Sequence, residues 1–72
     1  MNLDYARTIS LHNILERIGL PISLHINAQH NTWTDTTTGS LGGPVELVQA
    51  WLLHQGRPCT EDDALRWLRF NV

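Results

Sequence analysis

The sequence predicts a small α+β fold, with an N-terminal helix, a β-hairpin and two C-terminal helices packed on one small core. Three observations lead to this prediction. Apolar residues recur at helical spacing in three separate segments. After the first of these segments, apolar and polar residues alternate as they do in half-buried strands. The chain has 72 residues, which leaves room for a single domain, residues 1–72, with one modest core.

The first predicted helix begins at Ser10 and ends at Gly19. Serine is a preferred residue for capping a helix N-terminus, and a glycine shortly before a proline is a stop signal. The apolar face of this helix consists of Leu11, Ile14, Leu15 and Ile18. A start near Asp4 is an alternative, since Tyr5 and Ile9 extend the same face.

The next predicted element is a β-hairpin. In its first strand, Ile22, Leu24 and Ile26 alternate with polar residues. The polar segment 28–31 is expected to turn the chain, and residues 32–36 resume the alternation with β-branched side chains. A hairpin of this size is marginally stable alone, so we expect it to pack on the helices.

The two C-terminal helices follow a glycine-rich loop over residues 36–43. Pro44 has the position that proline favours in the first turn of a helix, and Gly56 is expected to end that helix. Thr60 and Asp63 resemble a capping box for the last helix. The apolar residues of the two helices are Val45, Leu47, Val48, Trp51, Leu52, Leu53, Ala64, Leu65, Trp67, Leu68 and Phe70.

The composition favours a folded, cytoplasmic protein. Hydrophobic residues make up 42% of the chain and the net charge is only −2, so disorder is not expected. The single cysteine, Cys59, excludes an intramolecular disulfide and a multi-cysteine zinc site. Because no basic segment is followed by a long apolar run, we expect neither a signal peptide nor a membrane span.

The positive charges are all arginines, which suit bidentate recognition of phosphate or carboxylate. They are Arg7, Arg17, Arg57, Arg66 and Arg69. A codon bias toward arginine explains the same composition. The acidic balance of the chain argues against strong non-specific affinity for DNA, which normally requires a basic surface.

No catalytic constellation is predicted, so we expect a protein that is not an enzyme and needs no cofactor. A nucleophilic Cys59 would require a base and an orienting group, and a small thiol packed under the last helix is the simpler interpretation. Helix capping explains the adjacent carboxylates Asp62 and Asp63.

The four histidines do not have the closely spaced ligand pairs of a structural zinc site. Convergence of His25, His30 and Asp35 across the hairpin is the one metal arrangement that stays open. We favour surface or partly buried imidazoles and predict no metal ligand.

Two features near the middle of the chain are candidate nucleic-acid contacts. Trp33, on the second predicted strand, is either a core residue or a platform on which a base stacks. Gly42 and Gly43 either expose backbone N–H groups to an anion at a helix N-terminus or let the hairpin pack closely on the helix. The loop is not a P-loop, because the Gly-Lys-Ser/Thr signature is missing.

Residues 33–48 read WTDTTTGSLGGPVELV, and residues 62–68 read DDALRWL. Together these motifs resemble the CHC2-type zinc-binding domain at the N-terminus of bacterial and phage DNA primases. In that family an aromatic strand leads through a glycine-rich knuckle into a helix, and a short last helix follows. Residues 10–21 are also similar to the opening helix of the family. The resemblance includes no polymerase domain, so priming activity is not carried over.

The zinc ligands of the family are not reproduced. Its second cysteine pair aligns with Asp35 and Thr38, and the region of its first pair offers only His25 and His30. Gly43 stands where the family tends to have aspartate. The resemblance therefore implies a related fold that has lost its zinc.

For function, the resemblance implies contact with single-stranded DNA or docking on a replication protein. The residues expected to make these contacts are Trp33, Arg57, Arg66 and Arg69, with Gly42 and Gly43. We predict a non-catalytic, primase-like module that binds single-stranded DNA or assists a replication enzyme of a phage or mobile genetic element. The alternative is a protein-interaction module, such as a small phage or plasmid inhibitor or accessory subunit, without direct nucleic-acid binding. The acidic charge favours this alternative, and the partner and any homo-oligomerisation stay open.

Overall fold

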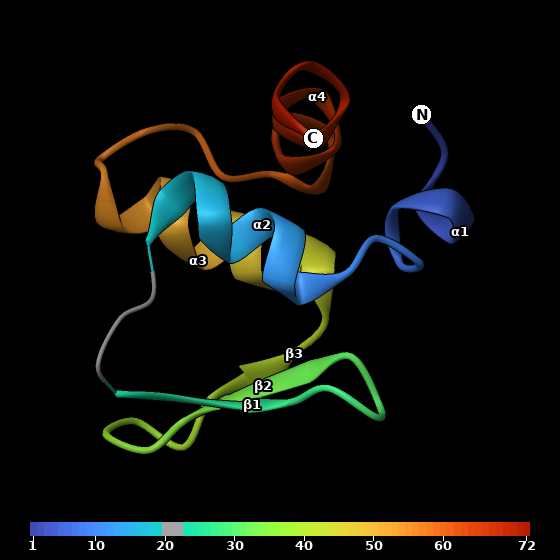
Figure 1. Ribbon diagram of the computed structural model, residues 1–72. Coiled ribbons are helices and arrows are strands. Elements are labelled where there is room, and N and C mark those ends of the chain that lie inside the picture. Colours follow the sequence, from blue (N-terminus) through green and yellow to red (C-terminus); the bar gives the residue numbers. More distant parts are fainter. Residues whose placement is uncertain (20–22) are drawn as a thin grey trace.

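The structure is a computed structural model that describes residues 1–19 and 23–72. It has the predicted α+β class, in which helices cover one face of a three-stranded antiparallel sheet and α3 lies between the sheet and α4 (Figure 1). The elements are α1 (Leu3–Ala6), α2 (Leu11–Ile18), β1 (Leu24–Asn27), β2 (Thr32–Asp35), β3 (Leu41–Gly42), α3 (Pro44–His54) and α4 (Glu61–Asn71). Within the described ranges, none of these helices has the length and apolar character needed to cross a membrane.

α2 begins and ends where the sequence predicts, with the Ser10 hydroxyl capping its N-terminus and Gly19 following its last residue. The alternative of an earlier start is corrected, because α1 is a separate short helix and the chain turns between the two. Tyr5 is 61% exposed and does not extend the apolar face of α2.

β2 is the central strand of the sheet and pairs antiparallel with both β1 and β3. The second strand of the hairpin ends at Asp35 rather than at Thr36, and the predicted strand residue Ile22 lies outside the described residues. β3 corrects the prediction that residues 36–43 form only a loop. A strand of two residues is too short to show the alternation by which strands are recognised in a sequence.

α3 forms the centre of the core, because the sheet, α2 and α4 all pack against it. Val45 and Val48 are fully buried, and Leu47 and Leu52 are nearly so. Leu53 is 67% exposed, which corrects its expected place on the buried face. The other buried residues of the core are Ala6, Leu11, Ile14, Trp33, Ala64, Trp67 and Leu68.

Trp33 joins the sheet to the start of α3. Its side chain is buried, and its indole N–H donates to the backbone carbonyl of Gly43 at 2.9 Å. Next to it, a Cβ atom on Gly42 would lie 2.6 Å from Glu46 Cβ and 3.3 Å from the Trp33 ring. Glycine at this position therefore allows β3 and α3 to approach each other.

Asn31 links the turn of the hairpin to the connection between α1 and α2. Its Oδ1 accepts the backbone N–H of Leu11 at 2.9 Å, and its Nδ2 donates to the carbonyl of Ile9 at 2.8 Å. The first N–H groups of a helix have no partner within the helix. Asn31 thus supplies an acceptor at the start of α2 from a residue of the hairpin.

We predict that Gly42→Ala lowers the free energy of unfolding by about 1–3 kcal/mol, because the new methyl group clashes with Glu46 Cβ, which cannot move without the α3 backbone. Gly43→Ala is the matched control. Its Cβ would lie 3.3 Å from Oε1 at the flexible end of Glu46 and 3.9 Å from the Asn31 carbonyl oxygen, which is an ordinary contact. The measurement is urea unfolding followed by tryptophan fluorescence. Equal losses for the two variants would contradict the close-packing explanation.

Candidate nucleic-acid interface

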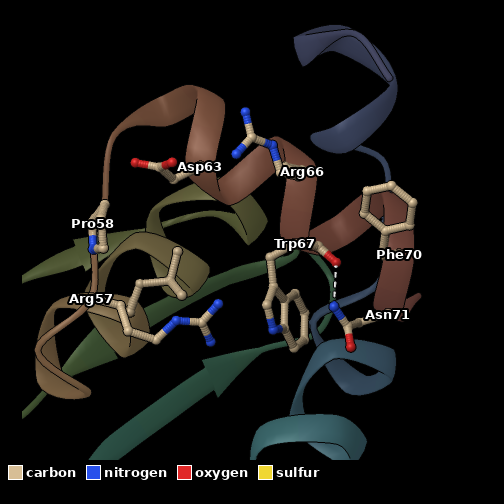
Figure 2. Close-up of a pocket in the computed structure, with 8 residues that line it drawn as sticks. Arg57, Pro58, Asp63, Arg66, Trp67, Phe70 and Asn71 are labelled. Atoms are coloured by element: carbon tan, nitrogen blue, oxygen red, sulfur yellow. Dashed lines mark hydrogen bonds between the residues drawn. The ribbon is translucent and has the colours of Figure 1, made fainter.

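A groove lies between α4 and the connection from α3 to α4, and it encloses about 320 Å³ (Figure 2). We call it the arginine groove, because two of its residues are Arg57 and Arg66. Its full lining is Leu52, Arg57, Pro58, Asp63, Arg66, Trp67, Phe70 and Asn71. Two of the predicted site residues therefore come together from separate elements.

Four lining residues lie on one stripe of α4, namely Asp63, Arg66, Trp67 and Phe70. Their spacing of i, i+3, i+4 and i+7 places them on the same helical face. At 1.5 Å per residue the stripe is roughly 10 Å long. The face is thus mixed, with a carboxylate at its N-terminal end, an arginine next to it and an exposed aromatic ring at its C-terminal end.

Arg57 is placed by the way α3 ends. Gly56 has φ +70 and donates its N–H to the carbonyl of Leu53, while the Arg57 N–H reaches back to the carbonyl of Leu52. This pair of bonds is a Schellman motif, in which the residue after the helix adopts a left-handed conformation that glycine accepts without strain. The sequence Gly56-Arg57 therefore turns the chain at a defined residue and sends Arg57 into the groove.

The Arg57 side chain is further oriented by an aromatic pair. Its guanidinium carbon lies 6.0 Å from the centre of the Trp51 ring, a distance at which a cation and an aromatic face attract each other. Trp51 in turn packs on Trp67, with ring centres 5.5 Å apart and planes tilted by 58°. Trp67, which lines the groove, is thus packed against the ring that Arg57 covers, while Arg57 itself is exposed to solvent.

Asp63 caps α4 and lines the groove at the same time. Its Oδ2 accepts both the backbone N–H and the hydroxyl of Thr60, at 3.1 and 2.7 Å, and the Thr60 hydroxyl accepts the Asp63 N–H. The two hydrogen bonds from Thr60, helped by the nearby positive charges of Arg66 and Arg57, lower the pKa of Asp63 from its ordinary value of 3.8. The carboxylate is therefore ionised at neutral pH.

Over residues 1–19 and 23–72, neither arginine of the groove lies within ion-pair distance of a carboxylate, and the one acid–base contact joins His12 Nε2 to Glu16 Oε1 on α2 at 3.0 Å. Arg69 lies outside the lining, and its guanidinium carbon sits 5.6 Å from the centre of the Phe70 ring. Phe70 is 74% exposed, so its ring combines a free surface with a neighbouring cation.

The other predicted contacts, Trp33 and the pair Gly42 and Gly43, lie outside the arginine groove. Trp33 is only 5% exposed, so its ring offers no open face on which a base could stack, and the core alternative holds. Gly42 lies in β3, and the N–H of Gly43 donates to Glu46 Oε1 at 2.8 Å. The Gly43 N–H is thus bonded to the Glu46 carboxylate, and Pro44 has no N–H to offer an anion.

The metal arrangement that the sequence left open is not assembled among the described residues. His25 pairs with Thr34 and Leu24 pairs with Asp35 in the β1–β2 ladder, so His25 and Asp35 point to opposite faces of the sheet. His30 lies in the turn beyond the strands. In the part of the chain that the structure describes, no three His, Cys, Asp or Glu side chains come together as metal ligands would.

Trp67 and Phe70 line the groove although their helical spacing predicted that both belong to the core. A signal was present in their spacing. Ala64 and Leu68 lie on one stripe of the last helix, whereas Phe70 lies on the stripe of Asp63 and Arg66. This position on a stripe with two charged residues indicates exposure for Phe70, whereas Trp67, on the side of the stripe nearer to Ala64 and Leu68, is buried.

No family model, no curated protein and no solved structure matches the chain. A proposal about its function therefore rests on the residues of the site. The resemblance to the primase zinc-binding domain accordingly remains a prediction.

Asp63 makes stability depend on pH. Because its pKa is lowered in the folded protein, its ionisation contributes stability that is fully present above the unfolded value near 3.8 and is lost as the pH falls below it. We predict that the difference in unfolding free energy between the native protein and Asp63→Asn is largest near neutral pH and shrinks below about pH 4. Urea unfolding across this range measures it. Asp62→Asn corrects for the loss of one negative charge, and a difference that does not change with pH would contradict the prediction.

Proposed function

We propose that the chain is a small non-catalytic module that binds single-stranded DNA in the arginine groove and assists a replication enzyme of a phage or mobile genetic element in the cytoplasm. The observation that carries the proposal is the union of Arg57, Arg66 and the exposed ring of Phe70 in one groove. Single-strand binding without strong sequence preference combines a positively charged groove, which follows the backbone, with aromatic rings on which bases stack.

The groove residues have separate roles in the proposed binding of phosphate and base. Arg57 and Arg66 make no ion pair within the described residues and so can offer their guanidinium groups to phosphate oxygens, which arginine binds through two parallel hydrogen bonds. Phe70 has an exposed ring, and Arg69 lies close to it, where a phosphate next to the stacked base is within reach of its charge. Trp33 and the glycines have no part in this proposal.

The replication context rests on the resemblance to the primase zinc-binding domain, whose motifs include Arg66 and the helix start around Asp63. With Asp63 in the groove and a net charge of −2, we propose modest affinity that rises when a replication protein holds the module close to the strand.

Docking on a protein without DNA binding is the second candidate. The observation in its favour is a set of large apolar side chains that are exposed, Leu41 at 72%, Leu53 at 67% and Phe70 at 74%. Exposed apolar residues that cluster mark interaction surfaces, whereas single ones are common on any protein. The experiments below separate the two candidates.

We predict that Arg57→Gln and Arg66→Gln each weaken binding of a labelled single-stranded oligonucleotide. Each variant is expected to reduce the slope of log affinity against log salt by about 0.7 for every phosphate that the missing arginine no longer neutralises. Arg17→Gln, on α2 and outside the groove, is the matched control and keeps the native slope. Fluorescence anisotropy at several salt concentrations measures both quantities.

Two results would count against the proposal. If the native protein shows no saturable binding at about 100 µM, which lies at the weak end of non-specific binding, the protein-docking candidate takes its place. If Arg17→Gln weakens binding as much as the groove variants do, the binding surface lies elsewhere.

We predict that Phe70→Ala weakens binding by about 1–3 kcal/mol, the usual contribution of one stacked base. The ring is 74% exposed, so the unfolding free energy is expected to change by no more than about 0.5 kcal/mol. Leu53→Ala, which removes an equally exposed apolar side chain outside the groove, is expected to leave DNA affinity unchanged. Isothermal titration with the same oligonucleotide tests both variants, and equal affinities for all three proteins would exclude a stacking role for Phe70.

A further inference from the structure

Asp63 offers the arginine groove a hydrogen-bond acceptor. Both hydrogen bonds from Thr60 end on Oδ2, and in the described ranges Oδ1 has no hydrogen-bond or ion-pair partner. Asp63 is part of the groove lining, and in Figure 2 it stands on the first turn of α4, next to the segment that carries Pro58. A ligand there meets a fixed oxygen that can only accept, since the carboxylate is held ionised.

The exocyclic amino group of a nucleobase is the natural partner for such an oxygen. Cytosine presents an N4 amino group, for which aspartate and glutamate are suitable acceptors. Uracil and thymine present a carbonyl oxygen at the same position, which a carboxylate repels. The N3–H of uracil can also donate to a carboxylate, but the accepting oxygen then lies between two carbonyl oxygens, whereas one N4–H of cytosine points toward C5–H, where no acceptor is adjacent. A carboxylate in a DNA-binding groove therefore weakens binding in general but less for bases that carry an amino group.

We propose that Asp63 gives the arginine groove a base preference, favouring a nucleotide with an exocyclic amino group over one with a carbonyl at the same position. This inference rests on the proposed function, which supplies the single strand, and adds a specificity-determining residue to it. Arg66 lies one helical turn from Asp63 and holds the adjacent phosphate, while Phe70 lies two turns away, so the base at Asp63 and the base at Phe70 are different nucleotides.

The experiment compares two unstructured oligonucleotides of equal length, one of deoxycytidine and one of deoxyuridine, at neutral pH. The two bases have the same ring size and similar stacking area. The native protein is expected to bind the deoxycytidine strand on the order of five-fold more tightly, as one hydrogen bond to a base edge provides. A strand of N4,N4-dimethyldeoxycytidine lacks the donor hydrogens and is expected to bind no more tightly than the deoxyuridine strand.

Asp63→Asn keeps the shape of the side chain but replaces one of its two acceptor atoms with a donor. The Thr60 N–H still requires an acceptor, so the amide oxygen takes the place of Oδ2 and the amide nitrogen takes the place of Oδ1. An acceptor in the groove becomes a donor, and the preference for deoxycytidine over deoxyuridine is expected to fall to one or below. Asp62→Asn removes the same charge at the neighbouring position, outside the groove lining, and is expected to keep the native preference.

The preference and the affinity report on different claims. If the native protein binds both strands with equal affinity, or if Asp63→Asn keeps the native preference, the inference about Asp63 is wrong while the proposed function stands. If neither strand binds, the proposed function fails and the inference fails with it. The dimethylated strand decides the matter with the native protein alone, should Asp63→Asn fold poorly.

Discussion

The hydrogen bond from the Trp33 indole to the Gly43 carbonyl fixes where α3 sits on the sheet, and the rest of the molecule is built on α3. The bond is partly buried and its donor belongs to a buried side chain, so breaking it would leave a largely desolvated indole N–H without a partner. It forms only because Gly42 has no side chain to keep β3 away from α3. α2 and α4 then pack against α3, and α4 carries the face that we assign to ligand binding.

The arginine groove arises from two helix ends that follow each other closely. α3 stops at a Schellman turn that directs Arg57, and α4 starts at a capping box whose carboxylate belongs to Asp63. The Gln49 side chain donates to the carbonyl of Cys59 and so ties the intervening segment to α3. A site made from such termini is ordered before a ligand arrives, which reduces the conformational entropy lost on binding. It also means that Asp63 serves stability and recognition together.

Much of this fold was predictable, because its helices and hairpin carry local signals. The helices begin or end next to the residues whose signals predicted a boundary, namely Ser10, Pro44, Gly56 and the Thr60 cap. The predictions that failed concern features that depend on tertiary contacts. β3 exists because β2 offers it a partner, and the opposite fates of Trp33 and Phe70, one buried and one exposed, depend on which neighbours cover each ring. For the site, the sequence singled out Arg57 and Arg66, but it could not show that they share a groove, since one belongs to a connection and the other to a helix face.

The two hydrogen bonds of Asn31 have a consequence for how the chain folds. They join residues that lie 20 and 22 positions apart, whereas most of the helical structure is local. Contacts of this kind raise the contact order and slow the search for the native topology. They also tie the N-terminal end of α2 to the hairpin turn, so the two segments are expected to detach together. We therefore expect the amide protons of α2 and of the β1–β2 turn to exchange through one shared opening event rather than through two independent ones.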